Sequence, residues 1–600
     1  MSNYTPPTDD IRFVMNHVAD LDGILATERF SHVDVDSIDA VIDEVARFMA
    51  DEVAPTNVDG ARIGSSWVAG ENGERDHVVT PDSFKPAYDK WVASGFGAMP
   101  FDAEYGGADF PWITAIAVQE LYTTSNMSLS LCPLLTQGAI DAIHAHGSDE
   151  QKNTYLPKML TGEWTGTMNL TEPQAGSDVG AVTTKADPIE GRDDGAYAIT
   201  GQKIYITYGD HDLAEQIVHL VLARTPGSAP GTKGISMFLV PKYLLNADGS
   251  LGERNGADVV SIEHKLGIHG SPTCVMQFEG AVGWLVGNEN DGMRNMFTMM
   301  NNARLSVGLQ GLSVSDRAFQ QSLQYAQDRT QGTALGAAKG TSSPIIEHAD
   351  VRRMLMTQRA WSDAMRCLVY TNAAALDRAV GATDVDDARS WRELADLLIP
   401  LSKSLCTDVS CEMTSIGVQI HGGMGYVEET GIAQHFRDAR ITPIYEGTNG
   451  IQAADLVGRK LAMRSGGVIS DLLGTFELTV KQLADIDGLA TFADRLGEAI
   501  ATSRTATEHL LSIAGTDPRS LLAGSAPYLR LLGTTVCGGL LAKAAVAASN
   551  GADFDADFLA AKVTSAKFFG EQILPTATGL LPAITSNADD LFALSAELLL

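Results

Sequence analysis

The segment MNLTEPQAGSDVG, at residues 168–180, combines hydroxyl side chains with residues that interrupt regular structure. Its proline and glycines favour a loop, so Thr171, Ser177 and nearby backbone N–H groups could face a ligand with polar edges. A plain connection between a helix and a strand explains the segment equally well. Taken alone, residues 168–180 are therefore only a candidate binding loop.

A second segment, GQKIYITYG at residues 201–209, has the composition of a strand. Side chains two residues apart lie on the same face of a strand, which places Tyr205 beside Thr207. A phenol ring and a hydroxyl in this arrangement suit a flat ring that has a polar edge. Tyrosine and threonine are also ordinary strand residues, so this signal is weak by itself.

The segment QIHGGMGY, at residues 419–426, contains two adjacent glycines. Without a Cβ, Gly422 and Gly423 would let the backbone approach a diphosphate, and Gln419 could donate a hydrogen bond. The segment is not a GxGxxG fingerprint and follows no expected strand. A glycine pair of this kind is more often a simple turn.

A carboxylate stands at a bend in RDARITPIYEGTNGIQ, residues 437–452. Glu446 precedes an expected helix, and a side chain at such a bend could project into a cleft and act as a base. The alternative is an exposed acid near the first turn of a helix, and composition alone favours that alternative.

Net charge limits the possible partners. The chain has 600 residues and a net charge of −32. An acidic surface repels phosphate backbones and anionic membranes, which argues against nucleic-acid binding. An anionic substrate would need a local positive site.

Cysteine usage and the N-terminus indicate a cytoplasmic protein. The six cysteines have no CxxC or metal-ligand spacing, so we expect reduced thiols and no metal site. The start, MSNYTPPTDDIRF, lacks the features of a signal peptide. The most apolar run, 531–548, contains Lys543 and is rich in Gly and Ala, so we interpret it as a packed helix.

Periodicity divides the chain into an α+β multidomain protein. Helical spacing dominates from residue 35 onward, for example in IDAVIDEVARFMADEV. Short β-rich runs separated by turns then indicate a small antiparallel barrel or sandwich. Helical patterns return after it, and RSGGVIS marks a further boundary. The predicted domains are an N-terminal extension 1–34, a helical domain 35–165, a central β-domain 166–285, a helical bundle 286–464 and an additional helical domain 465–600.

The four segments, in this order, resemble the acyl-CoA dehydrogenase family over roughly residues 35 to 460. EYGG at 104–107 and GSDEQKNTYLPKMLTGE at 147–163 add to the resemblance. It implies an N-terminal helical domain, a central antiparallel β-barrel and a C-terminal four-helix bundle, with FAD between them.

The resemblance assigns FAD contacts by position. The arginine among them would reach the diphosphate of FAD in a neighbouring subunit. Two departures, Gly332 and Gly450, stand where the family often has an aromatic residue and a glutamine, and they affect adenosine binding. The implied FAD contacts are Met168, Leu170, Thr171, Gly176, Ser177, Tyr205, Thr207, Arg329, Gln419, Gly422, Gly423 and Thr448.

The resemblance also implies α,β-dehydrogenation of an acyl-CoA thioester to the trans-2-enoyl-CoA. Glu446 would take the α-proton, and FAD would take the β-hydride. Some relatives carry the base at the position of Ala303, which cannot act as one. Arg304 has an alternative role as an ion-pair partner inside the bundle. The implied substrate contacts are Ser177, Asn301, Arg304, Tyr445 and Gly447.

The stretch from about 465 to 600 resembles the extension of a long-form subgroup. That subgroup includes 3-methylmercaptopropionyl-CoA dehydrogenases and broad-range fatty acyl-CoA dehydrogenases. The resemblance to this subgroup implies a homodimer that passes electrons to electron-transferring flavoprotein. Two alternatives remain: an acyl-CoA oxidase that uses oxygen, and a DNA-associated flavoprotein, which the acidic charge disfavours. The type of acyl chain is left open.

Overall fold

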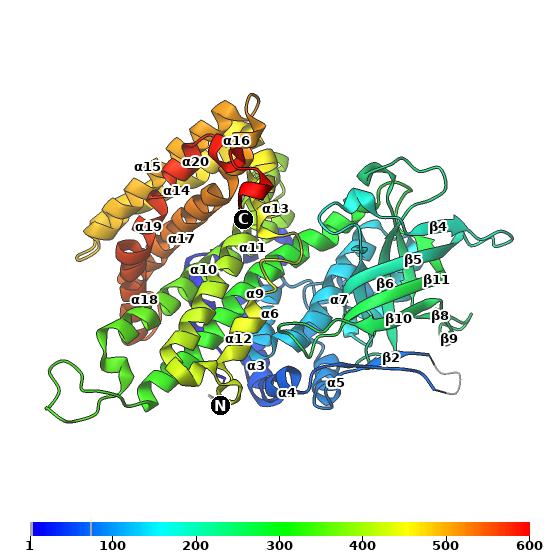
Figure 1. The fold of residues 1–600 in the computed structure, drawn as a ribbon, viewed down its shortest axis with the longest axis horizontal. Coiled ribbons are helices and arrows are strands. Elements are labelled where there is room, and N and C mark those ends of the chain that lie inside the picture. Colours follow the sequence, from blue (N-terminus) through cyan, green and yellow to red (C-terminus); the bar gives the residue numbers. More distant parts are fainter. Residues whose placement is uncertain (1–3, 72–74, 600) are drawn as a thin grey trace. The chain divides into compact units, whose positions relative to one another are not determined.

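The computed structural model describes residues 4–71 and 75–599, which form two compact units (Figure 1). The helical unit contains Met1–Asp43 and Val307–Leu600, and the sheet unit contains Glu44–Ser306. Two helices run across the boundaries, α3 (Val35–Phe48) and α9 (Gly292–Asp328). The N-terminal extension therefore belongs to the same compact unit as the C-terminal helices.

The sheet unit begins with helices. Nearly every residue of α6 and α7 is buried, and Asn126 caps α7 by accepting a hydrogen bond from the Leu129 N–H at 3.1 Å. The expected helical pattern is thus confirmed, but a short hairpin at Ser66–Val68 and His77–Val79 was missed, because strands of three residues leave almost no periodic signal. The helices are α4 (Asn57–Arg62), α5 (Phe84–Ser94), α6 (Trp112–Ser125), α7 (Met127–His146) and α8 (Asp149–Thr161).

A seven-stranded sheet forms the rest of this unit. Its order is β3-β6-β7-β11-β5-β4, and β10 pairs with β11. The prediction of an antiparallel domain needs one correction: β3 pairs with β6 in parallel, because the chain passes through β4 and β5 at the other end of the sheet before β6 returns beside β3 in the same direction. The strands are β3 (Trp164–Asn169), β4 (Lys185–Pro188), β5 (Ala196–Thr207), β6 (Gln216–Ala223), β7 (Ser236–Pro241), β10 (Ala257–Ile262) and β11 (Thr273–Leu285).

Long helices form the core of the helical unit. A Cβ added at Gly308 of α9 would lie 2.7 Å from the Ser402 carbonyl oxygen of α11, and one at Gly311 would lie 2.6 Å from that of Cys406. These glycines therefore allow the two helix backbones to approach closely. The other helices of this bundle are α10 (Ala349–Gly381), α11 (Val385–His421) and α12 (Ile432–Ala439), followed by the short α13 (Asn449–Asp455).

The C-terminal extension is also helical. Its central helix α17 (Ser525–Ser549) is long and apolar enough to cross a membrane, but 83% of its most apolar window is buried inside the protein. The interpretation of this run as a packed helix is confirmed. The extension also contains α14 (Gly467–Ala484), α15 (Ala490–Ile513), α16 (Pro518–Ala523), α18 (Ala556–Phe568), α19 (Leu574–Thr578), α20 (Leu581–Thr585) and α21 (Asp589–Phe592).

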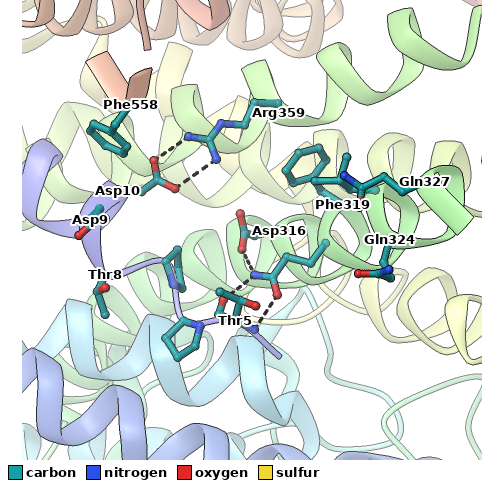
Figure 2. Close-up of a pocket in the computed structure, with 14 residues that line it drawn as sticks. Thr5, Thr8, Asp9, Asp10, Asp316, Phe319, Gln324, Gln327, Arg359 and Phe558 are labelled. Atoms are coloured by element: carbon teal, nitrogen blue, oxygen red, sulfur yellow. Dashed lines mark hydrogen bonds and ion pairs between the residues drawn. The ribbon is translucent and has the colours of Figure 1, made fainter. Parts of the chain in front are cut away.

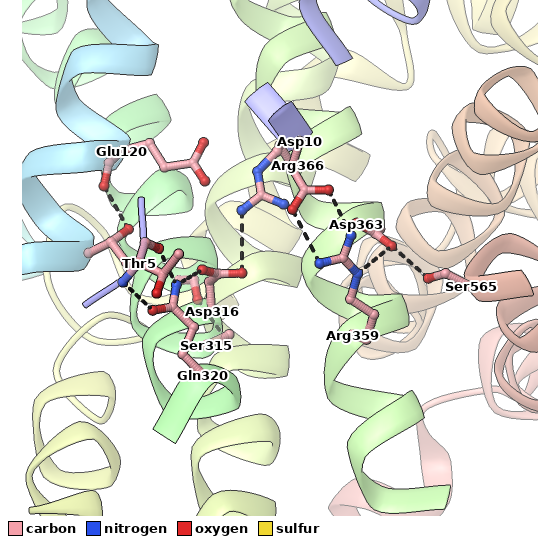
Figure 3. A network of polar contacts seen from close by, with 12 residues as sticks. Thr5, Asp10, Glu120, Ser315, Asp316, Gln320, Arg359, Asp363, Arg366 and Ser565 are labelled. Atoms are coloured by element: carbon pink, nitrogen blue, oxygen red, sulfur yellow. Dashed lines mark hydrogen bonds and ion pairs between the residues drawn. The ribbon is translucent and has the colours of Figure 1, made fainter. Parts of the chain in front are cut away.

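A buried cluster of charges joins the two ends of the chain to the bundle (Figure 3). Asp10 of α1 (Thr8–His17) accepts two hydrogen bonds from Arg359 of α10, at 2.7 and 3.2 Å. Lys562 of α18 forms ion pairs with Asp10 and with Asp363, the latter at 2.8 Å. Ser565 donates a further hydrogen bond to Asp363 at 2.6 Å. We call these five residues the terminal charge cluster.

A cavity of about 400 Å³ lies beside this cluster (Figure 2). The segment from Thr5 to Asp10 forms one wall, and α9, Arg359 and Phe558 form the others. Gln320 already binds the backbone of Thr5, through its oxygen at 3.1 Å and its nitrogen at 3.0 Å. None of the described residues that line the cavity is a predicted site residue, so the chemistry is expected elsewhere.

Candidate active site

In the sheet unit the fold brings the first two sequence segments together. The Thr167 hydroxyl of β3 donates to the Thr207 carbonyl oxygen of β5 at 2.6 Å. The Ile204 N–H donates to the Thr171 carbonyl oxygen at 2.9 Å. The loop that follows β3 is thereby held along the C-terminal end of β5. Predicted ligand contacts from residues 168–171 and 205–207 are therefore neighbours.

Tyr205 lies on a bulge and not on a regular strand. The register between β5 and β11 shifts after Lys203 and before Ile206, and Tyr205 has a φ of 61°. A left-handed tyrosine is uncommon and costs free energy, so the surrounding pairing must impose it. Tyr205 is 59% exposed, whereas Ile206 is buried. The bulge thus presents the phenol ring on the surface of the sheet unit, next to the half-buried Thr207.

A buried ion pair fixes the adjoining loop. Lys203 donates to Glu172 at 2.8 Å and to the Leu170 carbonyl oxygen at 3.1 Å. Burial favours the neutral forms of both groups, and it lowers the pKa of Lys203 to about 8. For Glu172 the Lys203 ammonium and the hydrogen bonds from Thr184 and Thr183 outweigh burial, and its pKa is about 2. The pair ties the candidate binding loop to the bulge that carries Tyr205.

The remaining predicted contacts of this unit differ in exposure. Leu170 is buried, Met168 and Thr171 are half-buried, and Gly176 and Ser177 are exposed. A Cβ added at Gly176 would meet no atom within 4 Å, so the backbone there is open to approach. The loop therefore offers a graded surface, apolar at its base and polar at its tip.

The predicted coenzyme A contacts lie on the first part of α9. Asn301 is half-buried, and Arg304 is 6% exposed, with its guanidinium carbon 5.7 Å from the centre of the Phe297 ring. The neighbouring Asn302 bonds to Asp141 of α7, and burial raises the pKa of this carboxyl to about 7 despite that bond. Arg304 is thus a packed residue whose aromatic contact holds it in place.

In the helical unit, Glu446 stands in a strained turn between α12 and α13. Its φ is 57°, and Gly447 follows with a φ of 86°. Two successive left-handed residues reverse the chain so that α13 can begin at Asn449. The Gln452 side chain donates to the Glu446 carbonyl oxygen at 3.3 Å, and the carboxylate oxygen Oε2 is inaccessible to solvent. The carboxylate thus has one buried oxygen and is not a freely solvated surface acid.

Residues on both sides of Glu446 are also anchored. The Tyr445 phenol donates to Gln310 of α9, which is almost fully buried. Burial and the Glu446 carboxylate raise the pKa of this phenol well above its ordinary value, so it stays protonated as a donor. Thr448 caps α13 by accepting a hydrogen bond from the Ile451 N–H at 3.3 Å.

The glycine pair lies at the C-terminal end of α11, next to the end of α9. The rings of Tyr325 and His421 stack there, 4.2 Å apart. Gln419, Gly422 and Gly423 are exposed, as is Arg329, which donates to Gln331 at 3.3 Å. The Gly422 N–H donates to the Gln419 carbonyl oxygen, so this N–H is not offered to a phosphate.

Comparisons with known proteins agree with this architecture. Models of the acyl-CoA dehydrogenase N-terminal, middle and C-terminal domains match residues 36–163, 167–281 and 290–461. A fourth, described as acetyl-CoA dehydrogenase C-terminal like, matches residues 472–595. The chain is 43% identical over 595 residues to a 3-methylmercaptopropionyl-CoA dehydrogenase of Ruegeria pomeroyi, covering 99% of this chain and 100% of that protein. The chain belongs to the acyl-CoA dehydrogenase family.

Other members extend the comparison. A broad-specificity linear acyl-CoA dehydrogenase of Mycobacterium tuberculosis is 33% identical, with 99% of each chain covered. Caenorhabditis elegans ACDH-11 shares the fold with a TM-score of 0.75 at 18% identity, covering 96% of this chain and 92% of that one. An acyl-CoA dehydrogenase of Bacillus anthracis complexed with FAD has a TM-score of 0.73 at 21% identity, covering 95% and 90%. The predicted fold class is confirmed, and the protein is an enzyme of this family.

FAD is the cofactor of this family, and the sheet unit fits its ring. The ring is flat and mostly apolar with polar edges. The exposed Tyr205 and half-buried Met168 supply apolar surface, and the hydroxyls of Thr171, Ser177 and Thr207 supply polar groups beside it. In the helical unit, a Cβ added at Gly422 or Gly423 would meet no atom within 4 Å, so the backbone there is open to approach.

Several residues of the site region were not identified from the sequence. Glu172 and Lys203 lie inside the quoted segments, but a lysine in a strand usually faces solvent. Gln310, which accepts from Tyr445, and Lys403, which donates to Asn449 at 2.8 Å next to the Glu446 turn, lie in long helices with no motif around them. No local pattern marks these residues as buried, because a charged or amide side chain in a strand or helix normally faces solvent.

Proposed function

We propose that the enzyme oxidises an acyl-CoA thioester to the trans-2-enoyl-CoA, with Glu446 as the base that removes the α-proton. The observation that carries the proposal is a carboxylate with a buried oxygen on a left-handed turn. A carboxylate in a strained and anchored turn has a fixed direction, which proton abstraction from carbon requires. An ordinary surface acid has no such constraint.

The chain's own groups account for the proton step. The α-proton passes to Glu446, and negative charge develops on the thioester oxygen as the enolate forms. Backbone N–H groups at the turn, such as that of Glu446 itself, suit this oxygen because hydrogen-bond donors stabilise developing charge. FAD, when bound, accepts the β-hydrogen with its electron pair.

The proposal includes the contacts with the substrate and with FAD that the family resemblance implies. Arg304 and Asn301 on α9, together with Ser177 in the loop after β3, would contact coenzyme A. Tyr445 and Gly447 would contact the acyl thioester next to Glu446. FAD would contact the residues from 168 to 177, Tyr205, Thr207, Arg329, Gln419, the glycine pair and Thr448. The arginine would reach the FAD of a second subunit.

The physiological setting is part of the same proposal. We propose a cytoplasmic homodimer with the five predicted domains, which passes electrons to electron-transferring flavoprotein. The relative in Ruegeria pomeroyi makes 3-methylmercaptopropionyl-CoA the first acyl thioester to test. Straight-chain acyl-CoAs come next because of the broad-specificity relative.

The decisive experiment compares the wild type with Glu446→Gln, which keeps the size of the side chain but removes its basicity. Each FAD-loaded enzyme is mixed without oxygen with acyl-CoAs of increasing length, and the flavin absorbance is followed. We expect bleaching by at least one substrate in the wild type and retained yellow colour in the variant. Bleaching of the variant at the wild-type rate would place the base elsewhere.

A second assay identifies the electron acceptor. Turnover of the bleaching substrate is measured with electron-transferring flavoprotein under nitrogen, and separately in air without it. We expect fast turnover only in the first case. Peroxide release in air at a comparable rate would make the enzyme an oxidase.

A further inference from the structure

The side chain of Asn449 connects the Glu446 turn to α11. Its amide nitrogen lies within hydrogen-bonding distance of three acceptors, the Thr407 hydroxyl at 2.9 Å, Asp408 at 2.7 Å and the Ser404 carbonyl oxygen at 3.2 Å, among which its two hydrogens are shared. Its oxygen accepts a hydrogen bond from Lys403 at 2.8 Å. The donor and acceptor groups of this one amide are thus directed at residues 403–408 of α11.

Lys403 is unusual because its side chain is fully buried in a helix core. Burying an ammonium group costs free energy, and an apolar residue of similar size would pack α11 against α13 without that cost. A charged donor, however, makes a stronger and more directional hydrogen bond than a neutral one. The Lys403–Asn449 bond therefore suits a role in precise placement more than in stability.

The bond acts close to the proposed base. Asn449 follows Glu446 by three residues, so their Cα atoms are at most about 11 Å apart. Glu446 and Gly447 between them have positive φ angles. A left-handed conformation of a residue other than glycine costs about 1–3 kcal/mol and persists only when its surroundings enforce it. Asn449 restrains the turn on its C-terminal side, and the Tyr445–Gln310 bond restrains it on the other.

We propose that Lys403 and Asn449 are positioning residues that hold the Glu446 turn in its left-handed conformation. This inference rests on the proposed function of Glu446. Neither residue is assigned a contact with the substrate. Loss of either one would leave the carboxylate chemically intact but less precisely aimed, so the proton step would slow while substrate affinity stayed nearly the same.

The test uses the FAD-loaded full-length enzyme with Lys403→Met, Asn449→Ala and the double variant. The matched control is Lys481→Met, at an exposed lysine of α14. The readouts are kcat and KM, FAD content, and the exchange of α-deuterium on a 3-thia-acyl-CoA with solvent. The last readout reports proton abstraction without oxidation of the substrate.

We expect kcat and the exchange rate to fall by between about tenfold and about one hundredfold in both single variants, as for a small misplacement of a catalytic group. KM should change by less than about threefold, because the contacts that bind the substrate equally in its ground state and its transition state remain intact. FAD content should equal that of the control. The kcat and exchange rate of the double variant should not fall below those of the less active single variant, because both substitutions remove the same Lys403–Asn449 hydrogen bond.

Two results would overturn the proposal: exchange within about twofold of the control in both single variants, or a loss that lies wholly in KM. If Lys403→Met does not fold, Asn449→Ala decides the question, since it removes no charge. A wild type that neither bleaches nor exchanges would refute the proposed function itself. A wild type that does both, with Glu446→Gln inactive and the Lys403 and Asn449 variants unaffected, would refute only the positioning role.

Discussion

Lys562 offers a direct test of how the two ends of the chain are held to the bundle. Its side chain is 4% exposed and lies between the carboxylates of Asp10 and Asp363, which are 11% and 2% exposed. Lys562→Met keeps the length of the stem but removes the charge. Both carboxylates then depend on Arg359, with Ser565 as a further donor to Asp363.

The expected loss follows from this geometry. Removing one partner of a buried ion pair costs about 3–5 kcal/mol, because the other charge remains buried. Since Arg359 still bonds to both carboxylates, we expect the lower end, about 3 kcal/mol. Asp10→Asn combined with Lys562→Met removes one charge of each sign. The loss in free energy of unfolding of the double variant should therefore be smaller than the sum of the two single losses by about 1–3 kcal/mol.

Urea unfolding followed by circular dichroism measures this loss, and hydrogen exchange of the α1 amides locates it. Lys567→Met on the same helix is the control, because its ion pair with Glu571 is long, at 3.9 Å, and its side chain is 44% exposed. We expect the α1 amides to exchange faster in Lys562→Met only. A loss below about 1 kcal/mol, with α1 protection unchanged, would refute the reasoning, since that is the range of a surface ion pair.

Further predictions concern single groups. Glu172→Gln leaves Lys203 buried without its carboxylate and should cost about 3 kcal/mol or more in urea unfolding; full stability in this variant would contradict the role of the pair. The pKa of Glu172 is about 2 in the fold, against an ordinary 4.5. Its stabilising contribution is therefore complete above pH 4.5 and should disappear as the pH falls toward 2. Acid titrations of the wild type and the variant measure this difference. Gly447→Ala places a Cβ on a residue with a φ of 86°. The variant should lose about 1–2 kcal/mol of stability in an unfolding experiment and much of its activity in the flavin-bleaching assay. An unchanged kcat would speak against a strained turn. Asp384→Ala removes the cap of α11, where Asp384 accepts from two backbone N–H groups at 3.0 and 2.9 Å, and should cost about 1 kcal/mol with no change in kcat.

Features that depend on local pattern could be predicted. The run 531–548 was interpreted as a packed helix from its Gly and Ala content and its single lysine, and it lies in the buried helix α17. The Asp34 carboxylate accepts a hydrogen bond from the Ser37 N–H at 2.8 Å near the start of α3, which is a contact between residues three apart. Such features involve residues that are neighbours along the chain, so the sequence contains all the necessary information.

Features that depend on partners far along the chain could not be predicted. Alternation placed Tyr205 on a regular strand, whereas the register shift against β11 puts it on a bulge with a positive φ. The parallel pairing of β3 with β6 is likewise decided by where the chain returns after it has passed through β4 and β5. A residue's own type does not reveal which strand will lie beside it.

The amino-acid sequence by itself determined the order of helical and β-rich regions, the family, and the candidate base Glu446, because periodicity and short motifs are local properties. Only the tertiary structure decided that Lys203 pairs with Glu172 and that Lys403 holds Asn449. Both lysines look like solvent-facing residues when viewed along the chain. Whether a charge is buried, and which group compensates it, depends on elements that meet only after folding, since desolvation and pairing are set by three-dimensional surroundings.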